Sequence, residues 1–133
     1  MNGVNQSFRD LTVYKKAFAL AMEVFEISKL FPKEERYSLT DQMRRSSRAV
    51  CSCLAEAYRK RSYPAYFVSK CSDADMENSE TQSWLDFSNA CGYISAEQHQ
   101  VLIAKSEEVG KLLNHMIENP EKYLKQSEKI QAQ

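Results

Sequence analysis

The stretch that decides the fold runs from residue 31 to residue 61 and reads FPKEERYSLTDQMRRSSRAVCSCLAEAYRKR. Pro32 ends a preceding helix, because proline lacks the amide hydrogen and clashes with the turn before it. Ser38, three residues before Asp41, has the spacing of a capping box at the start of a second helix. That helix is expected to run to about Lys60. Its apolar face comprises Leu39, Met43, Ser47, Val50 and Leu54.

The middle of this second helix has few bulky side chains. Between Arg45 and Tyr58 the small residues are Ser46, Ser47, Ala49, Cys51, Ser52, Cys53, Ala55 and Ala57. Small side chains let helix axes approach to the short end of the usual separation of about 8–10 Å. We therefore expect this helix to be clamped between others.

Upstream, a first helix is expected from Phe8 or Asp10 to about Leu30. Its apolar residues recur at three- and four-residue steps in two stripes. One stripe is Leu11, Tyr14, Phe18, Ala21 and Phe25, and the other is Val13, Ala17, Leu20, Val24 and Ile27. A helix at the edge of a monomeric bundle needs only one such stripe. Two stripes are compatible with a central position within one chain or with a subunit interface.

Downstream, Ser62 is the expected N-cap of a third helix, and Pro64 fits just inside it. A seam of Phe67, Cys71, Ala74, Asn78, Thr81, Leu85 and Ser88 follows at helical spacing. Asn78 and Thr81, if buried, need hydrogen-bond partners, because an unsatisfied polar group costs about 1–3 kcal/mol. We expect Asn78 and Thr81 to form a hydrogen-bond network with residues of the second helix.

Gly92 supplies the left-handed residue that commonly ends a helix, and Ser95 with Gln98 forms a capping box for a fourth helix. That helix is expected to stop before Pro120. Its apolar face comprises Leu102, Val109, Leu112, Leu113, Met116 and Ile117.

The four expected helices predict an all-α, antiparallel up-down-up-down four-helix bundle. With 133 residues the chain is expected to form one domain, residues 1–133, with a core over 8–119 and a frayed tail over 121–133. Three glycines and three prolines are too few for a turn-rich all-β fold.

The four cysteines, Cys51, Cys53, Cys71 and Cys91, follow no signal peptide, and no stretch is apolar enough for a membrane span. We therefore expect a cytoplasmic chain with reduced thiols and no membrane contact. A zinc site with His99 and His115 is disfavoured by the cysteine spacing. Helix-packing thiols are the simpler interpretation, and neither a metal nor a cofactor is expected.

Equal numbers of acidic and basic residues, 18 of each, conceal a segregation of charge. The basic residues between 44 and 61 are Arg44, Arg45, Arg48, Arg59, Lys60 and Arg61, against Glu56 alone. Residues 73–86 carry the acids Asp73, Asp75, Glu77, Glu80 and Asp86 and no base. The two helices can pair their charges across a groove, or the six basic residues can bind the phosphates of RNA or DNA. Arg59, Lys60 and Arg61 lie beyond the acidic run and are the better candidates for phosphate.

Catalytic residues are not expected. His99 and His115 lack the Glu three residues before them that di-iron bundles use, and no glycine-rich phosphate loop or nucleophile signature is present. The sequence therefore predicts a non-enzymatic protein.

The segments FPKEERYSLTDQMRRSSRAV, LAEAYRKR, SDADMENSETQSWLDFSNACGYIS and GKLLNHMIEN resemble the four-helix bundle proteins encoded in bacterial 23S rRNA intervening sequences. The resemblance covers about Phe8 to Asn119. It extends to the accessory variability proteins of diversity-generating retroelements, which form pentameric barrels that bind nucleic acid and a reverse transcriptase. It implies a homo-oligomer, expected as a pentamer, an RNA or DNA ligand, and a reverse transcriptase partner where the gene lies in a retroelement.

Many relatives have a proline in the middle of the second helix, where this chain reads Val50, Cys51, Ser52 and Cys53, so we expect a less kinked helix here. The function expected is an oligomeric nucleic-acid-binding or scaffold module. The alternative is a protein-binding adaptor without a nucleic-acid role, using the acidic third helix or the second stripe of the first helix.

Overall fold

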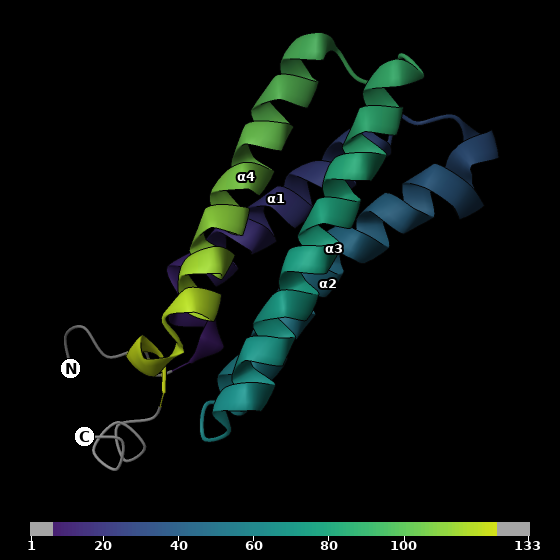
Figure 1. Ribbon diagram of the computed structural model, residues 1–133. Coiled ribbons are helices and arrows are strands. Elements are labelled where there is room, and N and C mark those ends of the chain that lie inside the picture. The colour runs from purple at the N-terminus through teal and green to yellow at the C-terminus, as the bar shows by residue number, and fades with distance from the viewer. Residues whose placement is uncertain (1–6, 125–133) are drawn as a thin grey trace.

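The computed structural model describes residues 7–124, which contain no strand and four α-helices. The helices are α1 (Thr12–Ser28), α2 (Asp41–Arg59), α3 (Pro64–Ala90) and α4 (Ala96–Glu118). The chain reverses direction at each connection, and α3 and α4 run side by side in front of α1 and α2 (Figure 1). The predicted all-α four-helix fold is confirmed. None of these helices is both long and apolar enough to cross a membrane.

Short helical turns accompany the main helices at η1 (Phe8–Asp10), η2 (Lys33–Glu35), η3 (Arg36–Thr40) and η4 (Pro120–Lys122). The first helix is shorter than predicted, because Leu11 has an extended backbone with ψ of 131° that separates η1 from α1. At the other end, Tyr123 stacks on Phe67 with 6.0 Å between ring centroids. The rest of the predicted tail, residues 125–133, lies outside the described residues.

Two of the predicted helix caps are wrong. The Ser38 hydroxyl donates to a Glu35 carboxylate oxygen at 2.6 Å, and the π-helical turn η3 leads directly into α2 without a side-chain cap. Ser62 does not cap α3, since the N-cap is Tyr63 and makes no side-chain hydrogen bond. Pro64 does occupy the first turn of α3, as predicted.

The connection between α3 and α4 forms as predicted. Gly92 has a φ of 76°, in the left-handed region that glycine adopts without steric cost. The Ser95 hydroxyl accepts from the Gln98 amide at 3.0 Å, and the Gln98 side chain accepts from the Ser95 amide at 2.8 Å. Both donors at the start of α4 are thereby satisfied.

The predicted seam of α3 forms the interior face of the bundle. Its buried residues are Phe67, Cys71, Ala74, Asn78, Thr81, Leu85 and Ser88. On α2, Ser46 and Ser47 are buried as well, and α2 and α3 make the most extensive helix–helix contact of the described chain. The thin middle of α2 therefore serves close packing, as the sequence predicts.

A layer of polar side chains crosses the centre of the bundle. The Ser46 and Thr81 hydroxyls lie 2.8 Å apart, which joins α2 to α3. The Asn78 side chain donates to the Ser106 carbonyl and accepts from the Ser106 hydroxyl, both at 2.9 Å, which joins α3 to α4. The expected partnership with the second helix thus holds for Thr81, whereas Asn78 pairs with the fourth helix.

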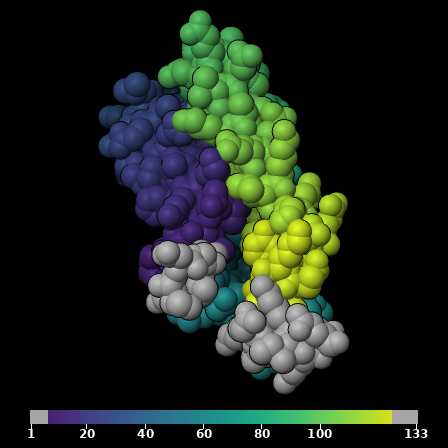
Figure 2. Space-filling view, turned by 90° about the vertical axis from the view of Figure 1, so that its left-hand side faces the viewer, coloured from purple at the N-terminus to yellow at the C-terminus, as the bar shows by residue number. Residues whose placement is uncertain are grey.

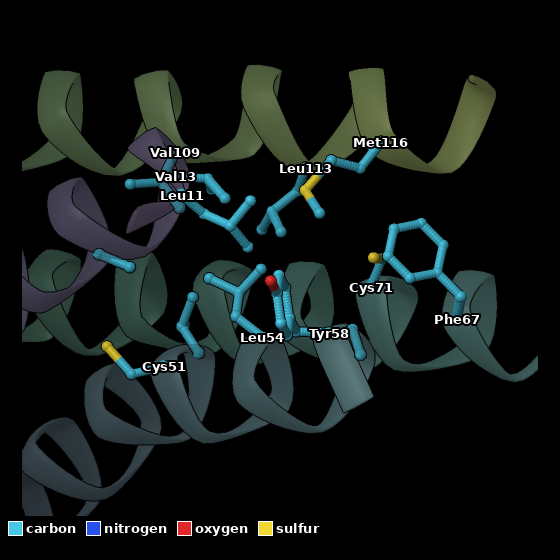
Figure 3. Packing of buried hydrophobic residues seen from close by; sticks show 14 residues of the cluster. Leu11, Val13, Cys51, Leu54, Tyr58, Phe67, Cys71, Val109, Leu113 and Met116 are labelled. Atoms are coloured by element: carbon cyan, nitrogen blue, oxygen red, sulfur yellow. The ribbon is translucent and has the colours of Figure 1, made fainter. Parts of the chain in front are cut away.

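Two apolar clusters lie on either side of this polar layer. One contains Leu20, Val24, Met43, Leu85 and Leu102, near the α3–α4 connection. The other gathers residues from all four helices, and its side chains from α2, α3 and α4 point toward one another in Figure 3. Its labelled members are Leu11, Val13, Cys51, Leu54, Tyr58, Phe67, Cys71, Val109, Leu113 and Met116.

The two predicted stripes of α1 are buried to different extents within the chain. Four of the five residues of the Val13 stripe are buried, whereas in the Tyr14 stripe Phe18 is 51% exposed. Met22 beside it is 46% exposed. Helix α1 is therefore not central within a single copy, and this apolar strip faces outward.

Candidate nucleic-acid interface

The six basic residues predicted to bind phosphate form two separate groups on α2. Arg44, Arg45 and Arg48 lie in its first half, whereas Arg59, Lys60 and Arg61 lie at its end. Arg48 and Arg59 are about three turns apart, or about 16 Å along the axis. The structure thus does not bring the six together into one patch.

Arg45 is committed to the acidic helix. Its guanidinium lies 2.7 Å from a Glu80 carboxylate oxygen and 3.2 Å from one of Glu77. Hydrogen bonds from Arg45 to Glu80 and then to Glu77 raise the pKa of Arg45. The predicted pairing of the second and third helices is therefore real, and it removes Arg45 from the candidates for phosphate.

Arg44 and Arg48 turn toward α1 instead. Both guanidinium groups lie over the Phe25 ring, at 4.8 Å and 5.5 Å from its centroid, and Arg44 also donates to the Ser28 hydroxyl at 2.8 Å. Within residues 7–124 neither arginine contacts a carboxylate. No carboxylate of residues 7–124 therefore neutralises their charge, and Arg44 is half-buried against α1.

The end of α2 carries the most available positive charge. Arg59 and Lys60 are exposed, and neither contacts a carboxylate within the described part of the chain. Arg61 is held more firmly, because its Nε donates to the Tyr58 carbonyl at 2.8 Å and its guanidinium stacks 3.6 Å from the Tyr58 ring centroid. Arg59 and Lys60 are thus the freest of the predicted residues.

The acids nearest to this end are neutralised by Lys70 of α3. Its ammonium lies 3.4 Å from a Glu56 oxygen and 3.7 Å from an Asp73 oxygen, and Glu56 chiefly raises the pKa of Lys70. A groove of about 270 Å³ runs between these groups and Phe8, with Arg59 and Lys60 on its lining. Three cations face one carboxylate there, so the groove favours an anion.

Two tyrosines at this end were missed by the reasoning from sequence. Tyr63 is 59% exposed and Tyr66 is 58% exposed, and Lys60 Nζ lies 5.6 Å and 4.8 Å from their ring centroids. The available signal was the alternation of aromatic and basic residues in YRKRSYPAY, residues 58–66, which is typical of nucleic-acid-binding surfaces.

The cysteines and histidines do not converge on a reactive site. Cys51 and Cys71 are buried, and burial raises the pKa of their thiols to about 11 and about 12. His99 pairs with Asp86 at 2.8 Å, and His115 with the Tyr123 hydroxyl at 2.8 Å. Within residues 7–124 no three His, Cys, Asp or Glu side chains are grouped to hold a metal ion.

Comparison with known proteins assigns the chain to a family. Residues 9–115 match the family model described as 23S rRNA-intervening sequence protein. The chain belongs to this family. The predicted resemblance is thereby confirmed over most of the chain.

A solved structure supports the same assignment. This intervening-sequence protein is 28% identical to a protein of unknown function from the S23 ribosomal protein family of Bacteroides thetaiotaomicron VPI-5482, with a TM-score of 0.73. The similarity covers 80% of this chain and 95% of that one. No curated protein matches the chain.

Proposed function

We propose that this intervening-sequence protein is a non-enzymatic, oligomeric module that binds RNA or DNA through the end of α2. The observation that carries the proposal is the charge left over at that end. Arg59 and Lys60 are exposed and form no ion pair with a carboxylate within the described chain, whereas the neighbouring Glu56 and Asp73 are paired with Lys70. Each phosphate that such residues neutralise adds salt-dependent affinity.

Filter binding to structured RNA and to DNA over a salt series tests this function. The double variant Arg59→Gln/Lys60→Gln is expected to bind more weakly and to reduce the slope of affinity against salt by about 2, one for each lost phosphate contact. The matched control is Arg45→Gln, which removes an arginine already paired with Glu77 and Glu80. No binding at low salt, or equal loss in both variants, would reject the proposal.

The proposed oligomer rests on the strip of α1 that faces outward. On one side of this strip a groove of about 390 Å³ is lined by Phe8, Tyr14, Phe18 and Met22, and by Arg48 of α2. Such a strip is normally buried in a soluble protein, so it marks a protein contact.

The groove on the other side of α1 is lined by apolar and acidic side chains, and of the acidic ones Glu23 and Glu26 are paired with Lys105 and Lys29. It measures about 540 Å³, lies between α1 and α4, and combines Met22, Ile27, Val101 and Leu102 with Glu23, Glu26 and Glu97. Figure 2 looks onto the face where α1 and α4 lie side by side. In the proposed oligomer the groove that contains Arg48 in one copy meets the groove that contains Glu97 in the next, a head-to-tail contact that forms a ring if the rotation between copies closes. The family resemblance adds the expectation of a pentamer.

Light scattering tests self-association. A mass several times the 15.4 kDa of one chain is expected at micromolar concentration, and Phe18→Glu is expected to reduce it to that of a single chain. A wild-type protein that remains at the mass of one chain would reject the oligomer.

The alternative function is a protein-binding adaptor, and the specific observation in its favour is the same apolar strip of α1. A different protein would then cover it. The adaptor would be favoured if the wild type is a monomer and one protein partner co-purifies with it after nuclease treatment but does not co-purify with Phe18→Glu.

The proposed setting is the cytoplasm, in keeping with four unpaired cysteines. Where a reverse transcriptase gene is adjacent, that enzyme is the first candidate partner.

A further inference from the structure

Tyr63 and Tyr66 have no packing role that accounts for their exposure. Neither belongs to either apolar cluster of the described chain, and more than half of each side chain is open to solvent. Tyr58, only five residues before Tyr63, is by contrast 6% exposed within the core. The two exposed rings flank the first turn of α3, immediately after the basic end of α2.

Lys60 lies over both tyrosine rings, so the two rings and the ammonium group form one continuous surface. A single ammonium nitrogen lies 4.8 Å from the Tyr66 centroid and 5.6 Å from the Tyr63 centroid, so the two aromatic groups are neighbours that share a cation. Arg59, which lines the neighbouring groove together with Lys60, is exposed and has no carboxylate partner among residues 7–124. Exposed aromatic rings next to a cation without a carboxylate partner provide both stacking for bases and contacts for phosphates.

This combination discriminates between forms of nucleic acid. In a duplex each base is already stacked and paired, so a tyrosine ring on the outside finds only phosphate and sugar. An unpaired base has a free face, and aromatic side chains in single-strand-binding proteins stack on such faces without regard to sequence. Two exposed rings would add no affinity to a surface that binds only the phosphates of a duplex.

We propose that Tyr63 and Tyr66 form a base-stacking platform, with Arg59 and Lys60 as phosphate contacts, and that the ligand is single-stranded nucleic acid. This inference rests on the proposed nucleic-acid function and adds the class of ligand. Charge favours this occupant over a protein: Lys60, which contacts both rings, also lines a groove with Arg59 and Lys70, and the one carboxylate on that lining, Glu56, is paired with Lys70.

The experiment compares an unstructured RNA of about 20 nucleotides with a duplex of the same length at the same salt, by fluorescence anisotropy. The wild-type protein is expected to bind the single strand more tightly. Tyr63→Ala/Tyr66→Ala is expected to lose about fivefold or more in single-strand affinity for each ring, with the salt slope unchanged. Its affinity for the duplex is expected to stay the same.

Two further variants separate stacking from folding and from charge. Tyr63→Phe/Tyr66→Phe keeps the rings and removes only the hydroxyls, so it is expected to retain single-strand binding. Arg59→Gln/Lys60→Gln is expected to weaken both forms and to lower the salt slope. Equal circular dichroism spectra would show that all variants fold alike.

The outcomes distinguish this inference from the function on which it rests. If neither nucleic acid binds the wild type, both fail. If binding responds to Arg59 and Lys60 but not to the loss of the rings, the function stands and the stacking platform is rejected. An equal effect of the alanine variant on single strand and duplex would also reject it. So would an alanine variant that loses self-association instead of RNA binding, because the rings would then belong to a protein contact.

Discussion

At the residue scale, the polar layer is the least replaceable part of the interior. Asn78 is 2% exposed and satisfies both the carbonyl and the hydroxyl of Ser106. Asn78→Ala would remove both of these buried hydrogen bonds and leave Gln82 as the remaining side-chain partner of the Ser106 hydroxyl, so we expect a loss of about 1–3 kcal/mol in the free energy of unfolding. Urea unfolding checks it against Asn114→Ala, an exposed position on α4. Equal stabilities of the two variants would contradict the role assigned to Asn78.

The buried thiols predict a loss of stability in alkaline solution. Burial raises the pKa of Cys51 to about 11 and of Cys71 to about 12 from a usual value near 9, so the folded protein holds these protons longer than the unfolded chain. Their contribution is complete below the unfolded pKa and is lost as the pH rises toward the folded values.

We therefore expect the free energy of unfolding to fall between about pH 8 and about pH 10.5 in the wild type, and to fall less steeply in Cys51→Ala and Cys71→Ala. Urea unfolding at the two pH values measures the difference. Cys91→Ala is the matched control, since Cys91 is exposed. A Cys91→Ala protein with the same reduced slope as the other two would show that burial is not the cause.

At the element scale, two glycines lie in opposite situations. Gly92 has a φ of 76°, which a side chain tolerates poorly, so Gly92→Ala is expected to destabilise the fold by about 1 kcal/mol. Gly110 is inside α4, where a Cβ would meet Asn78 Nδ2 at 3.4 Å, an ordinary contact. Gly110→Ala is expected to stabilise the fold by about 0.5–1 kcal/mol through helix propensity. Thermal unfolding should shift in opposite directions; shifts of the same sign would contradict this assignment.

The positions of the helices could be predicted from the sequence where apolar residues repeat at helical spacing. The α3 seam and the Ser95 cap emerged as predicted because a repeated apolar face and a reciprocal hydrogen-bond pair are local properties. The predicted cap at Ser38 does not form because the Ser38 hydroxyl binds Glu35 instead. The predicted cap at Ser62 does not form because α3 begins one residue later, after Tyr63. A single serine at the right spacing does not reveal such competition.

The candidate site was predictable only in part, for a related reason. The sequence showed that basic and acidic helices would pair, but which residues do so depends on the register between helices. That register assigns Arg45 to Glu77 and Glu80, and Glu56 to Lys70, which leaves Arg59 and Lys60 open. Tyr63 and Tyr66 become candidates for ligand binding only because the structure shows that both are exposed and belong to neither apolar cluster.

At the scale of the whole molecule, the apolar strip of α1 and the basic end of α2 form two adjoining regions, whose grooves share Phe8 and Ala55. The outward strip of α1 has a groove with Arg48 in its lining on one side and a groove with Glu23, Glu26 and Glu97 in its lining on the other, whereas the α2–α3 end presents cations and tyrosines. In the proposed function the first region joins copies of the chain and the second holds nucleic acid. A ring of such copies would repeat the basic end and raise its affinity through multivalency.

The location of bound nucleic acid is the central claim, and photo-cross-linking tests it most directly. Uridine-containing single-stranded RNA would be cross-linked to the wild-type protein, and the modified tryptic peptides would be identified by mass spectrometry. The account predicts cross-links on the peptide of residues 62–70, SYPAYFVSK, which carries Tyr63 and Tyr66. Cross-links confined to α4 or to the acidic middle of α3, with peptide 62–70 unmodified, would contradict it.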